Sequence, residues 1–241
     1  MANKGESKTQ KRISSPKVRK FLRKVNTFTI KSRPGPHSAK TSVPLGFVIR
    51  DMLKIVNNMK EAKHILHNTE VLVNGTRRQD HRFPIGIFDI VEIKQAKKKF
   101  RAVLNRKGAM VMNEMAQGEK NEKICKLVGK GTAKKGLTQL RFNDGTVLLS
   151  KDAKMHVGDS VKLELPSKKM LGIYALDKGS TAYVIGGVHV GKVARINEIV
   201  KGTITRSKLV NLASESEEFQ TIEENVFVIG KDEAEIEIGQ E

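Results

Sequence analysis

The spacing of apolar residues predicts helices near the start of the chain. From Leu45 to Val56 the apolar positions recur at helical intervals, which predicts one amphipathic helix. Ser42 is placed to cap this helix, and Pro44 falls in its first turn. After Asn57 and Asn58, residues 60–67 predict a second short helix with one apolar face.

The apolar pattern then shortens to the period of β-strands. Residues 71–73 predict a strand, and the following Asn74-Gly75 pair favours a type I′ hairpin turn. Residues 85–93 predict further strand because isoleucines alternate with other residues there. Residues 42–95 therefore form one predicted α+β domain.

Beyond residue 95 the pattern becomes almost entirely β. Short apolar runs are separated by turns such as Asn143-Asp144-Gly145, and many short strands in little space indicate small barrels. The predicted fold class is α+β, mostly β, with a central β domain over 96–171 and an SH3-like β-barrel over 172–231. The predicted strands span residues 100–104, 123–128, 137–142, 146–149, 160–165, 181–185, 192–200, 202–206 and 226–229.

An arm precedes these domains. Residues 1–33 hold eleven Lys or Arg and a single acid, Glu6, with too few apolar residues to form a core. We expect the arm, residues 1–41, to be disordered alone in water and to become ordered on RNA. The run from Arg33 to His37 contains two prolines and predicts a stiff turn that joins the arm to the first domain.

Charge is distributed unevenly along the chain. The net charge is +19 over residues 1–110, +9 over 111–210 and −9 over 211–241. A strongly basic first half indicates a polyanionic partner, above all nucleic acid. Phosphate would repel the last thirty residues, which end in the acidic tail 232–241, so we expect that segment to face something else.

Composition narrows the class further. The chain has no Trp, two Tyr and 38 % hydrophobic residues, which fits several thin cores better than one deep core. No apolar run approaches the roughly 18–20 residues of a membrane span, and the N-terminus lacks the apolar stretch of a signal peptide. Cys125 is the lone cysteine, which excludes an intrachain disulfide and fits a reducing cytosol. We therefore expect a cytoplasmic protein without a membrane partner.

One glycine-rich segment resembles a phosphate loop. Residues 186–193 match that motif up to the last position, where Val193 replaces the hydroxyl residue that holds magnesium. A phosphate loop also opens a helix, whereas the residues after Val193 predict a strand. The segment instead resembles a KOW motif, a tight basic turn between barrel strands, and Lys192 and Arg195 are placed to meet phosphates.

No enzyme chemistry emerges from the spacing of reactive residues. His64 and His67 share a predicted helix face, but no third metal ligand lies near them in sequence, so a solvated face is the stronger interpretation. No Ser-His-Asp or Cys-His grouping and no pair of carboxylates in apolar surroundings is present. We expect no catalytic residue, metal, cofactor or small-molecule substrate.

The basic residues supply the candidate RNA contacts. Few aromatic residues accompany them, so phosphate and shape recognition are favoured over stacking on single strands. The candidates are Lys11, Arg12, Lys17, Arg19, Lys20, Arg23, Lys24, Arg33, His37, Arg50, Lys54, Arg77, Arg78, Arg82, Lys97, Lys98, Lys99, Arg101, Arg106, Lys107, Lys192 and Arg195.

Several runs, in order, resemble the archaeal and eukaryotic (e-type) family of small-subunit ribosomal protein S4. They cover residues 11–231, and their combination is far more specific than any one of them. The matching runs are Arg33 to His37, Val43 to Leu45, Arg50 to Leu53, Val73 to Arg78, Phe83 to Val91, Val184 to Gly187 and Asn225 to Lys231.

The resemblance implies a basic arm, an S4-type RNA-binding domain, a family-specific β domain and a KOW barrel. It further implies a non-enzymatic constituent of the small ribosomal subunit that binds ribosomal RNA beside neighbouring ribosomal proteins. Two departures stand out: Val188-His189-Val190 occupies a turn where the family often carries smaller or polar residues, and the tail is acidic.

Other functions remain open at this stage. An RNA-modifying enzyme with a similar small RNA-binding domain is one, although the Arg-Leu-Asp segment typical of pseudouridine synthases does not occur. A KOW-containing transcription elongation factor is another. A polybasic membrane binder is less well supported because the arm lacks an amphipathic apolar face.

Overall fold

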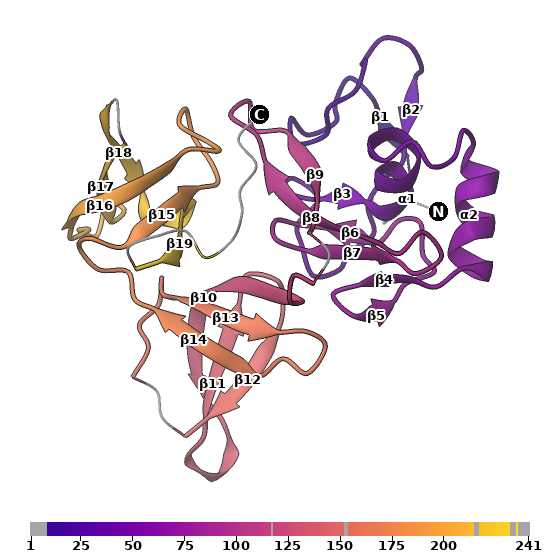
Figure 1. Ribbon diagram of the computed structural model, residues 1–241. Coiled ribbons are helices and arrows are strands. Elements are labelled where there is room, and N and C mark those ends of the chain that lie inside the picture. The colour runs from indigo at the N-terminus through magenta and orange to yellow at the C-terminus, as the bar shows by residue number, and fades with distance from the viewer. Residues whose placement is uncertain (1–8, 117, 152–153, 215–216, 232–234, 236–241) are drawn as a thin grey trace, which may run out of the picture. The chain divides into compact units, whose positions relative to one another are not determined.

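The computed structural model describes residues 9–116, 118–151, 154–214, 217–231 and 235, and it divides the chain into two compact units (Figure 1). The first unit comprises Met1–Val103 and Ala109–Gln117, and the second comprises Leu104–Gly108 and Gly118–Glu241. Of the acidic tail, residues 232–241, only residue 235 lies within the described part of the chain.

The first unit combines two helical segments with a five-stranded antiparallel sheet in the order β5-β4-β7-β8-β9. Two short ladders, β1–β2 and β3–β6, complete it. The elements are β1 (Gln10–Lys11), β2 (Phe28–Thr29), β3 (Val43–Pro44), α1 (Leu45–Phe47), the π-helical segment η1 (Val48–Met52), α2 (Met59–Asn68), β4 (Val71–Val73), β5 (Thr76–Arg77), β6 (Pro84–Ile85), β7 (Ile90–Ile93), β8 (Lys98–Leu104) and β9 (Met110–Glu114).

The first helical segment is shorter than its apolar pattern predicts. It ends at Met52 rather than at Val56, and Lys54 then takes a positive φ of 53°, which no helix accommodates. The predicted cap at Ser42 is also wrong, because the chain is extended at β3 and Pro44 occupies the N-cap position with ψ at 139°.

The second helix and the hairpin are confirmed. Glu61 in the first turn of α2 accepts backbone hydrogen bonds from Asn57 at 3.0 Å and Asn58 at 3.4 Å, and these bonds lower the pKa of its carboxyl group. Asn74 and Gly75 both adopt positive φ, 52° and 75°, as the type I′ turn between β4 and β5 requires.

The first sheet extends beyond the predicted domain boundary. β8 pairs with β7, bringing Ile90 opposite Arg101 and Ile93 opposite Lys98, and β9 adds a further strand that the sequence did not predict. The 94–97 turn is a hairpin within this sheet, so the sheet continues across the boundary predicted after residue 95.

The second unit holds two five-stranded antiparallel sheets, in the orders β12-β11-β10-β13-β14 and β18-β17-β16-β15-β19. The connection between them runs from the end of β14 to the start of β15. The elements are β10 (Glu122–Thr132), the 3-10 turn η2 (Lys134–Gly136), β11 (Thr138–Phe142), β12 (Val147–Ser150), β13 (Ser160–Glu164), β14 (Met170–Tyr174), β15 (Thr181–Val184), β16 (Val193–Val200), β17 (Leu209–Ala213), β18 (Glu218–Ile222), the 3-10 turn η3 (Glu223–Asn225) and β19 (Val226–Gly230).

Sequence patterns located most of these strands and missed others. β14, β17 and β18 had no counterpart among the predicted strands. The strand predicted over 202–206 is wrong, because those residues form the loop between β16 and β17. The first sheet of the unit closes over a core that includes Cys125, Leu127, Leu140, Phe142 and Val161.

Two buried lysines form polar contacts inside the second unit. Lys123 forms an ion pair with Asp144 at 2.9 Å. Lys126 lies on β10 and donates from Nζ to three carbonyl oxygens of the other sheet's η3–β19 segment: Glu223 at 2.5 Å, Glu224 at 3.3 Å and Val226 at 2.9 Å. Burial lowers the pKa of Lys126 to about 8. One ammonium group therefore links the two sheets of this unit.

A buried tyrosine fixes residues 104–108 to β15. The hydroxyl of Tyr183, fully buried, donates to the carbonyl of Leu104 at 2.5 Å and accepts from its amide at 3.1 Å. Burial raises the pKa of Tyr183 to about 12, so this hydroxyl stays neutral and can make both bonds at physiological pH.

Replacing Tyr183 with Phe should therefore destabilise the protein by about 2–4 kcal/mol, because two buried backbone groups of Leu104 lose their partner. Denaturant unfolding measures this free energy. The control is Tyr174→Phe, whose hydroxyl donates to the partly exposed carboxylate of Glu235 and whose loss should cost about 1 kcal/mol or less. Equal losses for the two variants would contradict this account.

Candidate nucleic-acid interface

The N-terminal arm packs on the rest of the first unit through a buried arginine. Arg19 is 2 % exposed and donates from Nη1 to the carbonyl of Ile30 at 3.0 Å, from Nη2 to the hydroxyl of Ser32 at 2.8 Å and from Nε to the carbonyl of Ser42 at 3.3 Å. Burial lowers the pKa of Arg19 to about 10, so it remains charged at neutral pH. Arg19 thus holds two segments of the arm and the start of β3 together.

Apolar and backbone contacts complete the attachment of the arm. The rings of Phe21 and Phe47 lie 5.5 Å apart, and the guanidinium of Arg12 lies 4.6 Å above the ring of Phe21. The amide of Met110 on β9 donates to the carbonyl of Val18. In the structure, residues of the arm thus pack on the rest of the first unit, and the expectation that the arm is disordered alone in water and becomes ordered on RNA stays a prediction.

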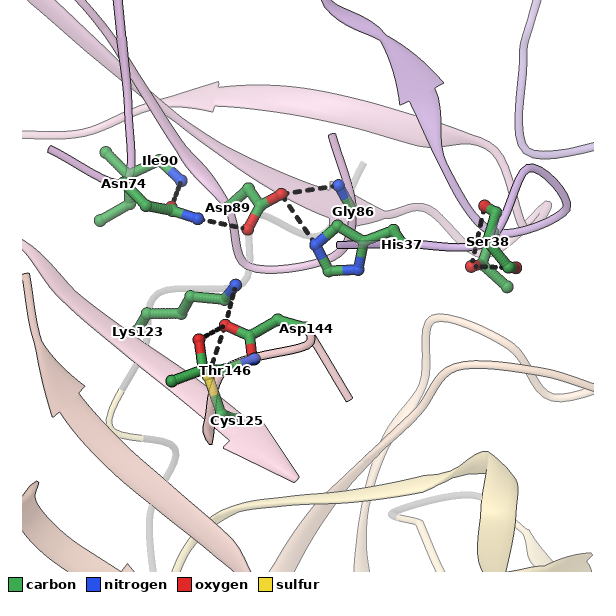
Figure 2. A network of polar contacts seen from close by, with 11 residues as sticks. His37, Ser38, Asn74, Gly86, Asp89, Ile90, Lys123, Cys125, Asp144 and Thr146 are labelled. Atoms are coloured by element: carbon green, nitrogen blue, oxygen red, sulfur yellow. Dashed lines mark hydrogen bonds and ion pairs between the residues drawn. The ribbon is translucent and has the colours of Figure 1, made fainter. Parts of the chain in front are cut away.

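The proline-rich turn is anchored by a buried carboxylate. His37, 8 % exposed, places Nε2 at 3.0 Å from Oδ2 of Asp89, which is itself fully buried (Figure 2). Asp89 also accepts from the Gly86 amide and the Asn74 side chain, both at 2.8 Å. The Asn74 side-chain oxygen accepts from the Ile90 amide, so the turn, the hairpin and β7 share one network. Figure 2 also draws the separate pair of Lys123 and Asp144.

A groove lies where the arm meets the rest of the first unit. It consists of two open hollows of about 590 and 280 Å³ that share Lys31 and Arg82. We call it the arm groove. Five Lys or Arg line it and no carboxylate does; these five are Lys31, Arg33, Arg50, Lys63 and Arg82. A concave cationic surface of this kind concentrates positive potential where a phosphate backbone can enter.

Nearby acids moderate two of these charges. Arg33 forms an ion pair with Asp80 at 3.1 Å, and Arg50 forms one with Asp51 at 2.7 Å. Both pairs are solvent-accessible, and pairs of that kind are weak enough to exchange for a phosphate. Lys63 is exposed on α2 and lies beside the His81 and Arg82 segment.

Most of the residues predicted to contact RNA lie on the surface. Twelve of them are exposed: Lys11, Lys17, Lys20, Lys24, Arg33, Lys54, Arg77, Lys97, Lys98, Arg106, Lys107 and Arg195. Seven are half-buried: Arg12, Arg23, Arg50, Arg78, Arg82, Lys99 and Lys192. The arm groove brings together Arg33, Arg50 and Arg82, with His37 in its lining, and leaves the others dispersed.

Three predicted contacts need correction because the structure buries them. Arg19, His37 and Arg101 are 2 %, 8 % and 3 % exposed. Arg19 and His37 form the contacts described above, and Arg101 lies on β8, between β7 and β9 in the first sheet. These side chains support the fold and do not present charge to a partner.

Sequence reasoning missed Lys31 and Lys63 of the arm groove. Lys31 stands two residues before the proline-rich turn, so its nearness to Arg33 was a usable signal. Lys63 stands one turn of α2 after Lys60, on the polar face, and only the folded arm brings it to the groove.

The glycine-rich segment 186–192 forms a turn between β15 and β16, and Val193 begins β16 rather than a helix. Lys192, predicted to contact RNA, pairs instead with Glu217 at 2.8 Å and lies 5.8 Å from the Phe219 ring. The hydrogen bond and charge of Lys192 lower the pKa of Glu217. His189 stacks on the same Phe219 ring at 4.1 Å. The turn is therefore braced against β18.

Other candidate chemistry is absent from the described part of the chain. Among those residues no group of three His, Cys, Asp or Glu is arranged to hold a metal, and His64 contacts Asn68 on its own helix. Cys125 is buried, and its thiol donates to Asp144. None of the helices described is both long and apolar enough to cross a membrane.

Fold and site together define a class: a mostly β protein whose first unit carries a cationic groove between an N-terminal arm and a small α+β module. Comparison with known proteins narrows this class. The model of ribosomal family S4e matches residues 96–170, and the RS4NT domain matches residues 4–40. The chain belongs to the ribosomal S4e family.

Full-length relatives support this assignment. Small ribosomal subunit protein eS4 of Methanothermobacter thermautotrophicus is 37 % identical over 99 % of this chain and 98 % of the relative. The same protein of Methanosphaera stadtmanae is 36 % identical over 96 % of each. The crystal structure of the 30S ribosomal protein S4e from Thermoplasma acidophilum is similar with a TM-score of 0.69 and 31 % identity, covering 79 % of this chain and 96 % of that one.

Replacing Arg19 with Met should detach the arm and destabilise the first unit by about 2–4 kcal/mol, because a buried charged hub with three acceptors is lost. Hydrogen exchange should speed up in residues 9–32 and in β3. Lys20→Met is the control, since Lys20 is an exposed neighbour. Unchanged exchange in the arm of Arg19→Met would refute the role of the hub.

Replacing Gly191 with Ala should cost more stability than replacing Gly187. Both residues have positive φ, 80° and 89°, so each substitution incurs about 1–2 kcal/mol of backbone strain. At Gly191 a Cβ would also lie 2.6 Å from the Asn105 carbonyl oxygen, whereas at Gly187 the nearest atom is 3.8 Å away. Thermal unfolding of the two variants measures the difference, and equal melting temperatures would disprove the close approach.

Proposed function

We propose that this protein is a structural constituent of the small ribosomal subunit that binds ribosomal RNA and supports translation in the cytoplasm. The observation that carries the proposal is the match, over nearly the whole chain, to relatives named small ribosomal subunit protein eS4. The cationic first unit supplies the physical means, since lysines and arginines release counterions from folded RNA.

Within this proposal each part of the chain has a role. Residues 42–95 are an S4-type RNA-binding domain, and the arm, residues 1–41, binds RNA beside it, with phosphates entering the arm groove. The sheet β15–β19 is a KOW-type, SH3-like barrel, which its five antiparallel strands and the glycine-rich turn 186–192 support. The partners are small-subunit ribosomal RNA and neighbouring ribosomal proteins, and the role needs no catalysis, cofactor or small-molecule substrate.

The mechanism is charge neutralisation combined with bracing. Side chains of the arm groove, such as Lys31, Lys63 and Arg82, contact phosphates and carry little sequence information. The sheets behind them are held by buried groups such as Arg19 and Asp89, so RNA segments bound to one unit keep a fixed spacing. No observation on the site favours an RNA-modifying enzyme or an elongation factor.

Sedimentation tests the proposal at the level of the cell. The tagged protein should travel with the small ribosomal subunit on a sucrose gradient and should remain there after a moderate salt wash. Sedimentation only as free protein would overturn the proposed function.

Salt dependence and groove variants test the mechanism. If about 6–10 phosphates are neutralised, affinity for small-subunit ribosomal RNA should fall about 10³–10⁵-fold between roughly 50 and 200 mM salt. Removing two groove charges by Lys63→Ala with Arg82→Ala should reduce the slope of log affinity against log salt by about 1.5–2. Lys60→Ala, an exposed lysine on the same helix outside the arm groove, is the matched control and should change the slope less. Equal effects of the double variant and the control would remove the groove from the interface.

A further inference from the structure

The loop between β16 and β17 forms a hydrogen-bonded turn with an exposed apolar residue at its tip. It covers residues 201–208, of which 202–206 were expected from the sequence to be a strand. The Thr203 amide donates to the carbonyl of Arg206 at 2.9 Å, and the Arg206 amide donates to the Thr203 hydroxyl at 3.2 Å. These two bonds close a turn around Ile204, which is the most exposed large apolar side chain described, at 106 %.

Positive charges flank this apolar tip. Lys201 and Arg206 are both exposed, and within the described residues neither side chain forms an ion pair. The loop contains no acid. Lys208, the last residue of the loop, pairs with Glu223 at 3.2 Å, so Lys201 and Arg206 carry the loop's charge that is not in a described ion pair.

The strands that follow the loop have the opposite character. Residues 209–230 contain five Glu and no Lys or Arg. Lys192, at the turn that precedes β16, is neutralised by Glu217. A basic loop that precedes these acidic strands is a local site for an anion. Its exposed apolar side chain favours a ligand that offers apolar surface as well.

We propose that the loop 201–208 is an RNA-binding finger, in which Lys201 and Arg206 contact phosphates and Ile204 packs against a ribose or an unstacked base. This inference deepens the proposed function, on which it rests, and adds a contact in the second unit. RNA supplies both chemistries at the required spacing, because backbone phosphates flank every sugar and base.

RNA fits this loop better than a protein partner does. The finger is narrow and offers one apolar side chain, whereas a stable protein interface needs a broad patch with several buried anchors. Apolar side chains inserted beside bases, with cationic neighbours on the backbone, are an established way of gripping a distorted or looped nucleic acid. A protein partner is accordingly the outcome that the experiment below is designed to detect.

Site-specific photo-crosslinking provides the test. A benzophenone amino acid replaces Ile204 in the full chain, and in a matched variant it replaces Ile222, a 40 %-exposed residue beside the acidic η3 turn. Each protein is assembled into small subunits and irradiated. We expect crosslinks from position 204 to ribosomal RNA, at one site in its sequence, and few from position 222.

The outcomes separate the finger from the function as a whole. A crosslink from position 204 to a ribosomal protein, or no crosslink in subunits that have incorporated the variant, overturns the finger and leaves the proposed function standing. Failure of the unsubstituted protein to enter small subunits overturns both.

Affinity measurements provide an independent test of the proposed RNA-binding finger. With purified small-subunit ribosomal RNA, Lys201→Ala with Arg206→Ala should lower the salt slope by about 1.5–2. Ile204→Ala should reduce affinity by about 3–10-fold with an unchanged slope, because an uncharged contact is lost, and Ile222→Ala should have no effect. An unchanged affinity for both loop variants would refute the finger.

Discussion

The attachment of the arm depends on one buried guanidinium. Arg19 donates to acceptors at Ile30, Ser32 and Ser42, and without it these buried acceptors would lose their donor. Burying a cation is costly unless hydrogen bonds replace its water, and here three partners do so. The arm groove exists only because the arm is held in this position.

The same residue types therefore serve two purposes in this chain. Arg19, Lys123 and Lys126 are buried and join segments that lie far apart in sequence, whereas Lys63 and Lys201 lie on the surface with their charge available. A strong positive charge makes a protein easy to bind to RNA but also disfavours compaction through self-repulsion. Some of the cations are instead buried among carbonyl oxygens, where their hydrogen bonds stabilise the fold.

The structural features that the sequence predicted correctly depend on short-range patterns of residues. The Asn74-Gly75 turn, helix α2 and most strands of the second unit follow from patterns a few residues long, and so the mostly β class was correct. The attachment of β8 to β7 and the docking of the arm depend on partners distant in sequence, which such patterns do not encode. The candidate site shows the same division: net charge indicated the first unit, but only the fold distinguishes buried Arg19 and Arg101 from Lys31 and Lys63, which line the arm groove.

The hydrogen bonds between Leu104 and Tyr183 have a consequence for the order in which the chain acquires its structure during synthesis. These residues are 79 positions apart, so the partner of Leu104 emerges on the order of 4–16 s later at ordinary rates of elongation. The first sheet needs nothing beyond β9 and is complete in sequence well before then. During synthesis the nascent chain therefore passes through a stage in which all strands of the first sheet have emerged. At that stage residues 104–108 still lack the hydrogen bonds that Tyr183 later provides.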